Sequence, residues 1–145
     1  MKLLTKAVLA AIIATSSASV FAASVFIPSG LQVSEINGVQ VNNSQEFELA
    51  EGQNLIKLTY LESFAVNADD SGSLVKSKPL FWHVSAQEGV DYTVSLPVLM
   101  TQDEARDYIQ HPVIQISDSK GLTRTDSLPS QSQLMAALFT QKVDF

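Results

Sequence analysis

The amino-acid sequence predicts a mainly β protein, with a single antiparallel β-sandwich or curved sheet of about seven short strands and two short helices. Three observations support this fold class. Apolar and polar residues alternate with a period of two in several segments. Turn-forming residues recur at the close spacing of an all-β domain. Two other segments have helical spacing instead. A chain of 145 residues is expected to form one domain.

The first 22 residues have the three-part form of a secretory signal peptide. Two lysines lie in a positively charged start, residues 7–15 form an uninterrupted apolar run, and small residues follow. We expect cleavage between Ala22 and Ala23, which leaves one β-rich domain at 23–145. The apolar run is roughly half as long as a membrane-spanning helix, which needs about 20 residues. The processed chain is therefore expected in the periplasm and is not expected to span a membrane.

The first short strands of the domain are expected at 31–36 (LQVSEI) and 39–41 (VQV). Asn37 and Gly38 lie between them. Both central residues of a type I′ turn need positive φ, and asparagine and glycine tolerate it. The segment therefore predicts a tight β-hairpin.

The strongest strand signal is at 54–64 (NLIKLTYLESF). Ile56, Leu58 and Tyr60 share one face, and most polar side chains share the other. The stretch that follows, 65–79, is rich in turn formers and is expected to be a mobile loop.

A strand at 80–85 (LFWHVS) carries apolar residues on both faces. Leu80, Trp82 and Val84 share one face, and Phe81 lies on the other. A strand that is apolar on both sides is typical of the middle of a sheet, so we expect a central strand.

The remaining elements alternate between strands and helices. Strands are expected at 91–96 (DYTVSL) and 113–117 (VIQIS), because apolar and polar residues alternate there. Between them, 101–110 begins with capping-box spacing and has acidic residues in its first turn, which predicts a short helix. A second helix is expected at 130–139, where leucines and a methionine have helical spacing after a proline.

Composition excludes several kinds of function. The chain has no cysteine, which removes disulfides, cysteine nucleophiles and Cys-ligated metals. It has 15 acidic and 9 basic residues, a formal charge of −6. Loss of the two lysines of the signal peptide leaves seven basic residues and a charge of −8. Such a charge argues against nucleic acid as a partner, because affinity for phosphates comes largely from Lys and Arg. No cofactor is expected.

No catalytic constellation is evident, and we expect no enzyme activity. His83 lies in the apolar strand, and His111 lies at the end of the first helix, without the spacing of zinc ligands. Each is expected to have a structural role, although a ligand or base remains the alternative. No G-x-S-x-G motif occurs, and Ser71 has acidic neighbours but no histidine nearby in the sequence.

Acidic residues are plentiful, but none lies in an apolar context. Asp103 and Glu104 are expected to complement the N-terminus of the first helix. The segment 67–72 (NADDSG) resembles the start of an EF-hand calcium loop. Its twelfth position is Lys78, where a bidentate acid is required, so we expect no metal site and interpret the segment as a polar loop tip.

Aromatic residues provide the candidates for ligand binding. Phe81, Trp82 and Tyr92 are expected on neighbouring strands, and aromatic side chains beside polar groups can hold sugars or extended peptides. We favour a place in the core for Trp82, because it is the single tryptophan and lies in the most apolar strand. Under the alternative, Trp82 and Tyr92 are the candidate ligand-binding residues.

The order of these features resembles the YccT-like family of small bacterial periplasmic proteins of poorly defined function. The resemblance covers nearly the whole chain after the predicted cleavage site. It rests on an opening strand (SVFIP, 24–28), Leu-x-Val-x-x-Ile-Asn-Gly at 31–38, Phe-Glu-Leu-x-x-Gly-x-Asn-x-Ile at 47–56, Lys-Pro-Leu at 78–80, the 92–97 strand before a helix with Ala105, Pro-Val-Ile at 112–114, and Gln-Ser-Gln-Leu-Met at 131–135. The longer members have an extra stretch before this last segment, which residues 122–129 replace here.

The resemblance implies an exported protein that is not an enzyme, and one member of that family is described as a modulator of curli assembly. It supplies no catalytic residues. Our leading hypothesis is therefore a non-enzymatic periplasmic protein that binds another exported protein or envelope component, with modulation of curli-type amyloid assembly as its specific role. The alternative hypothesis is a carbohydrate or envelope-ligand binding module.

Overall fold

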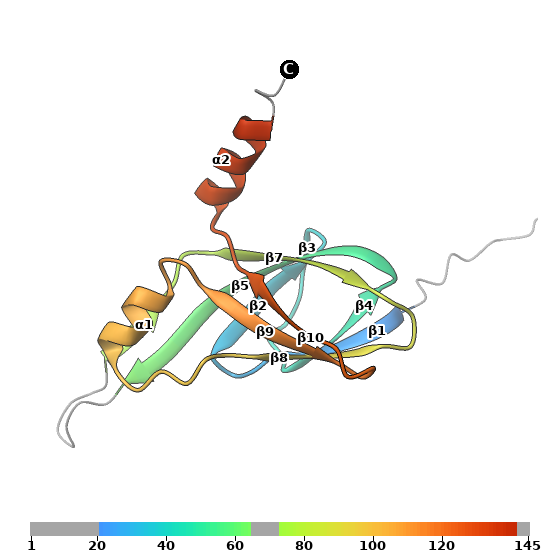
Figure 1. Cartoon of the computed structure of the whole chain (residues 1–145), viewed down its shortest axis with the longest axis horizontal. Helices are drawn as coiled ribbons and strands as arrows, with labels where there is room; N and C mark the ends of the chain where they lie inside the picture. The colour runs from blue at the N-terminus through green and yellow to red at the C-terminus, as the bar shows by residue number, and fades with distance from the viewer. Residues whose placement is uncertain (1–20, 65–72, 142–145) are drawn as a thin grey trace, which may run out of the picture.

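The computed structural model describes residues 21–64 and 73–141 and confirms the mainly β fold (Figure 1). Within these ranges the chain forms ten strands and two helices, more strands than the seven expected. The elements are β1 (Phe21–Phe26), β2 (Leu31–Ile36), β3 (Val39–Gln40), β4 (Glu46–Ala50), β5 (Gly52–Phe64), β6 (Ser73–Lys76), β7 (Leu80–Ala86), β8 (Asp91–Ser95), α1 (Gln102–Tyr108), β9 (Val113–Asp118), β10 (Thr123–Ser127) and α2 (Gln131–Gln141).

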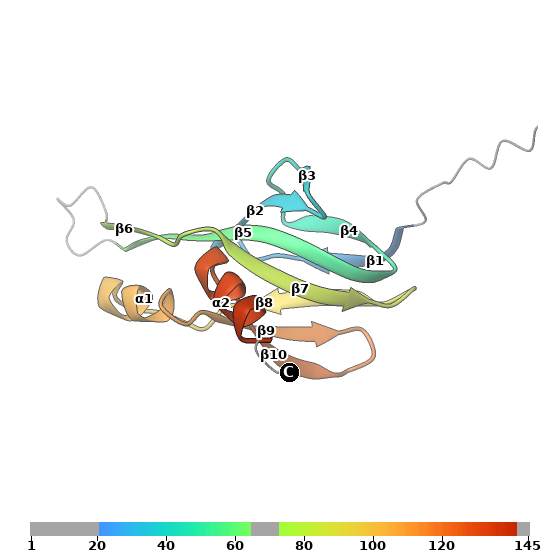
Figure 2. The same cartoon turned by 90° about the horizontal axis from the view of Figure 1, so that it is seen from above.

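The strands form two curved sheets. The first has the order β10-β9-β8-β1-β4, in which the β1–β8 pair is parallel and the other pairs are antiparallel. In the second, β2 lies between β3 and β5, while β6 and β7 follow one another along the other side of β5. Figure 2 shows the two sheets as layers, with β7 near the middle and β10 at one margin.

The long strand β5 organises the second sheet. Ile56, Leu58 and Tyr60 are buried, as their alternation predicts, because successive side chains of a strand point to opposite faces. The expected hairpin between β2 and β3 is confirmed as well, since Asn37 and Gly38 have φ values of 53° and 79°.

The core lies between the two sheets. Trp82 and Tyr60 are the largest fully buried side chains, and they are surrounded by aliphatic residues of both sheets. The expected helix at 101–110 is confirmed as α1, whose capping box joins Thr101 and Glu104. Its Ala105 is buried.

Three expectations about the elements were wrong or incomplete. Strand β7 is an edge strand, because its only strand partner among the described residues is β5. Its second face is apolar only at Phe81 and continues with exposed His83 and Ser85, which is too polar for a central position. Part of the stretch expected to be a loop, 73–76, is strand β6. Residues 65–72 lie outside the described part. Strands β4 and β10 were not predicted.

The second helix was predicted at 130–139 and is observed as α2, but its large apolar residues from Met135 onward are exposed. Met135, Leu138 and Phe139 are 46%, 57% and 63% exposed. In Figure 1 the helix projects away from the sheets. The helical spacing was therefore interpreted correctly, but the described residues do not cover the apolar side chains at 135, 138 and 139.

Candidate functional site

Among the described residues, the backbones at the margins of the two sheets are hydrogen-bonded to each other at one end of β7 and β10. The backbone N–H of Phe81 in β7 donates to the carbonyl oxygen of Pro129, which follows β10, at 2.9 Å. Leu80 and Ser130 form an antiparallel bridge beside it. Beyond this point β7 and β10 separate, and we call the region between them the seam. The described strands therefore form a partly closed barrel that is open along the seam.

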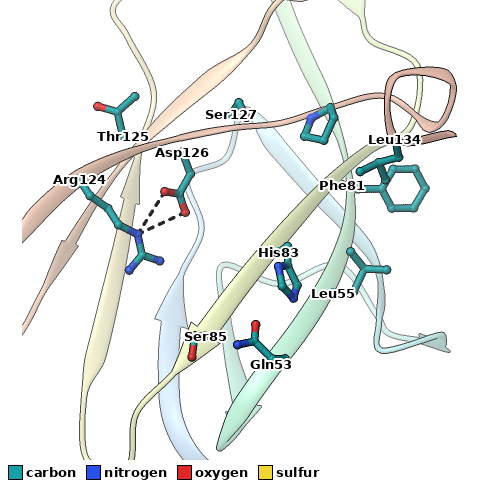
Figure 3. A pocket seen from close by; sticks show the side chains of 11 residues that line it. Gln53, Leu55, Phe81, His83, Ser85, Arg124, Thr125, Asp126, Ser127 and Leu134 are labelled. Atoms are coloured by element: carbon teal, nitrogen blue, oxygen red, sulfur yellow. Dashed lines mark hydrogen bonds and ion pairs between the residues drawn. The ribbon is translucent and has the colours of Figure 1, made fainter. Parts of the chain in front are cut away.

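A groove of about 660 Å³ occupies the seam. It is lined by side chains of β5, β7, β10 and the first turn of α2, namely Gln53, Leu55, Phe81, His83, Ser85, Arg124, Thr125, Asp126, Ser127, Pro129 and Leu134 (Figure 3). Leu55, Phe81 and Leu134 supply apolar surface, while amides and hydroxyl groups supply hydrogen-bonding groups.

The backbone groups at the edge of β7 can be assigned from the hydrogen bonds. In an antiparallel pair, residues that exchange hydrogen bonds with the partner strand alternate with residues whose N–H and C=O point away from it. Phe81 donates away from β5, toward Pro129. His83 and Ser85 share its orientation, so their backbone N–H groups face the seam. The carbonyl oxygen of Ser85 accepts a long hydrogen bond of 3.5 Å from the Tyr92 hydroxyl.

The same alternation applies to β10. Asp118 N donates to Leu122 O at 2.9 Å, and Leu128 N donates to Pro112 O at 2.9 Å, so the even-numbered residues of this segment bond to the β9 side. Thr123, Thr125 and Ser127 consequently point their N–H and C=O groups away from β9. All three are exposed. Both margins of the seam therefore present backbone donors and acceptors that the sheets themselves do not use.

Side chains connect the two margins. The buried Trp82 donates its indole N–H to Asp126 Oδ2 at 2.9 Å. Arg124 Nε donates to the two carboxylate oxygens of Asp126 at 3.2 and 3.3 Å, as the dashed lines in Figure 3 show. Asp126 thus accepts from a buried donor of β7 that would otherwise be unpaired, and Arg124 neutralises the charge of the Asp126 carboxylate.

The two candidate ligand-binding aromatics lie in the interior. Trp82 is fully buried, and Tyr92 is 4% exposed, with its hydroxyl accepting from Gln87 N at 3.0 Å. Neither ring therefore offers a free face on which a sugar could stack. Phe81 is the aromatic residue of this group that lines the groove.

The other residues singled out in the sequence are not brought together. His83 lines the groove, whereas His111 lines a separate hollow between the start of β9, the end of β10 and the start of α2. Glu104 is used in the capping box, and Asp103 lies 4.0 Å from Arg106 on the same helix. Ser71 and the 67–72 loop lie outside the described residues, so the expectation of no calcium site stays untested.

The described residues contain neither a metal-binding cluster nor a membrane-spanning helix. No group of three or more histidine or acidic side chains in 21–64 and 73–141 is arranged to hold a metal ion. Over the same ranges, neither helix has the length and apolar character that crossing a membrane requires.

The seam was not foreseen from the sequence because β10 has no strand signal. Its residues, TRTDS, contain no large apolar side chain, and four of the five are exposed. A signal was nevertheless present at the other margin. A buried tryptophan needs an acceptor for its indole N–H, so an acidic residue packed near Trp82 could have been sought.

The fold and the seam define a mainly β domain with an open strand edge on each side of a groove. Residues 24–144, nearly all of the chain after the predicted cleavage site, match a family described as uncharacterised protein conserved in bacteria (DUF2057), and the chain belongs to this family. No curated protein matches the chain, and no solved structure does.

Proposed function

We propose that this chain is a non-enzymatic periplasmic protein that binds an extended segment of another exported protein by strand addition at the seam. The observation that carries the proposal is the orientation of the edge groups. The backbone N–H groups of His83 and Thr125 face the same groove from opposite margins.

Strand addition suits the chemistry of this groove. An extended peptide obtains its affinity from main-chain hydrogen bonds to a free sheet edge, and its specificity from pockets for alternate side chains. The edges of β7 and β10 supply the main-chain hydrogen bonds, and the apolar side chains of Leu55, Phe81 and Leu134 supply contacts for the side chains of the peptide. Two facing edges can in addition satisfy both sides of one inserted strand.

The charge of the chain is consistent with a binder of aggregation-prone strands. A free edge is also a route to aggregation, and soluble proteins counter it with charge. The processed chain is expected to carry a net charge of −8, which opposes its unlimited association. The groove itself holds one aspartate and one arginine that neutralise each other.

The specific partner we propose is an amyloid subunit of the curli type. Membership of the bacterial DUF2057 family supports a bacterial origin for the chain. The curli role itself comes from the resemblance of the sequence to the YccT-like family. The physical reason is that the growing end of a cross-β fibre presents an unpaired strand, which is the structure that a free edge binds.

The test adds purified residues 23–145 to a polymerising curli-type subunit at substoichiometric ratio. We expect a longer lag and a lower fibre yield. Thr125→Pro removes one N–H that faces the seam without removing a bond to β9, because proline is tolerated on the free side of an edge strand. This variant is expected to lose the effect.

Glu48→Pro is the matched control. Ile27 N donates to Gln45 O, so the alternation points the N–H of Glu48 away from β1, at the opposite edge of the same sheet. This variant should keep the effect on the lag. An unchanged lag and yield with the unsubstituted chain would remove the proposed function, and an equal loss in both proline variants would remove the seam as its site.

A further inference from the structure

We propose that a second copy of this chain docks on the free edge of β10, antiparallel to it, with Thr125 on the two-fold axis. This inference uses one margin of the seam on which the proposed function rests, but it concerns a different occupant. Three features of the β10 edge support it: the direction of its backbone groups, the charges of its side chains and the length over which it can pair.

The register is set by the backbone. Thr123, Thr125 and Ser127 point their N–H and C=O groups outward. When two copies of β10 lie antiparallel with Thr125 opposite Thr125, Thr123 of each copy lies opposite Ser127 of the other. All outward groups then meet outward groups, and each of these pairs can exchange two hydrogen bonds. A shift by one residue would set outward groups against inward ones.

The charges of β10 are self-complementary in the same register. Arg124 and Asp126 flank Thr125, so Arg124 of one copy lies opposite Asp126 of the other, twice by symmetry. Both side chains are partly exposed, 46% for Arg124 and 22% for Asp126. Opposite charges directly across an antiparallel pair stabilise it, whereas like charges destabilise it. The segment 118–128 has two acidic and two basic residues, so the net charge of the chain does not repel this edge from itself.

The other edge of the same sheet lacks this property. Strand β4 has Glu46 and Glu48 exposed on its outward positions, and it has no basic residue. An antiparallel pair of two β4 edges would bring glutamates together, which is the arrangement that natural edges use against pairing. Charge as well as geometry therefore favours β10 over β4 as the edge that pairs with a second copy.

The length of the ladder is limited at both ends. The carbonyl oxygen of Pro129 is already used by Phe81, so pairing ends after Ser127. The same register places Leu122, which is 69% exposed, opposite position 128 of the second copy, just beyond the last hydrogen-bonded pair. The contact is small, which is typical of a transient association. A second copy and a partner strand would then compete for β10.

The test uses single cysteines, because the chain has none of its own. Hydrogen-bonded antiparallel partners have Cα atoms about 5.5 Å apart, within the range of a disulfide. Thr125→Cys should therefore form a disulfide-linked dimer on mild oxidation. Thr123→Cys is the matched control in the same exposed strand, because its two copies would lie about 13 Å apart, four residues at about 3.3 Å each.

A mixture of two variants tests the register independently. Thr123→Cys and Ser127→Cys should each stay monomeric alone and should cross-link when mixed. Fluorescence of the single Trp82 reports whether each variant is folded. Equal yields from Thr125→Cys and Thr123→Cys, or no gain on mixing, would overturn the proposed dimer.

The outcome is separable from that of the proposed function. The oxidised Thr125→Cys dimer is expected to have a smaller effect on fibre lag than the same variant kept reduced. Selective cross-linking, with no effect of the unsubstituted chain on fibre lag, would support the dimer and contradict the proposed function. An effect of the unsubstituted chain on fibre lag, without selective cross-linking, would support the proposed function and contradict the dimer.

Discussion

Asp126 is the residue on which the two margins of the seam depend. It accepts a hydrogen bond from the indole N–H of Trp82, with 2.9 Å between the nitrogen and the carboxylate oxygen, and it forms an ion pair with Arg124. Tryptophan was assigned from the sequence either to the core or to a ligand site, and the structure places it in the core with a polar partner. The need for an acceptor follows from the buried tryptophan, but which residue supplies it could not be predicted, because the two residues are 44 positions apart in the chain.

The first prediction concerns this contact. Asp126→Ala should lower the free energy of unfolding by about 1–3 kcal/mol, because it leaves the buried indole N–H without an acceptor. Arg124→Ala should cost at most about 1 kcal/mol, because it removes only an exposed ion pair. Urea denaturation followed by Trp82 fluorescence measures both, and equal costs would contradict this role of Asp126.

The second prediction concerns two tyrosines between α1 and β5. The rings of Tyr60 and Tyr108 lie with their centroids 5.3 Å apart. Burial is the main reason that the pKa of each lies above the ordinary value of 10, with Glu62 contributing at Tyr60 and Tyr60 contributing at Tyr108. The unfolded chain therefore releases these protons at lower pH than the folded chain does.

Stability is thus fully present below the unfolded pKa near 10 and is lost as the pH rises above it. Tyr108→Phe should show a smaller loss above about pH 10. At neutral pH it should cost about 0.5–1.5 kcal/mol, because the hydroxyl donates to Val113 O at 2.6 Å. Urea denaturation over a pH series measures this, and parallel curves for the two chains would contradict it.

Among the secondary-structure elements, the two helices differ in the contacts that stabilise them. Helix α1 has a capping box and buries Ala105 against the sheets, whereas α2 exposes residues 135–140. Helical spacing predicted both. It cannot predict whether an apolar face is covered, because that depends on strands that are distant in sequence.

The third prediction follows from this difference. Ala137→Pro should reduce the helical circular dichroism signal but change the free energy of unfolding by less than about 0.5 kcal/mol, as for surface changes away from packed features. Ala105→Pro should cost about 3 kcal/mol or more, because it breaks α1 and disturbs a buried position. A large loss of stability in Ala137→Pro would show that α2 packs on the sheets.

The strands show where sequence patterns carry information. Strands β2, β5, β8 and β9 were predicted because each has one buried and one exposed face, which produces alternation. Strand β10 has almost no buried face, and β6 is only four residues long, so neither produces a pattern. Strand β7 was predicted as an element but assigned to the sheet centre, because pairing on its second side is not encoded in its own residues.

For the whole molecule, the central feature is a partly closed barrel whose seam is bridged by side chains and one backbone contact. The alternation of apolar and polar residues and the spacing of turn residues predicted the mainly β class, and the composition excluded sites that need cysteine. They could not locate the seam, because it is formed by strands from different parts of the chain, one of which has no sequence signal. The function proposed for the chain depends on whether the edge groups of this seam are free.

Amide hydrogen exchange of residues 23–145, read residue by residue by NMR, tests that claim most directly. The N–H groups of His83 and Thr125 should exchange much faster than those of their neighbours Val84 and Asp126, which bond within the sheets. Addition of an extended peptide from a curli-type subunit should slow His83 and Thr125 selectively. Equal protection of Thr125 and Asp126 in the free chain, or no change at either margin with the peptide, would contradict it.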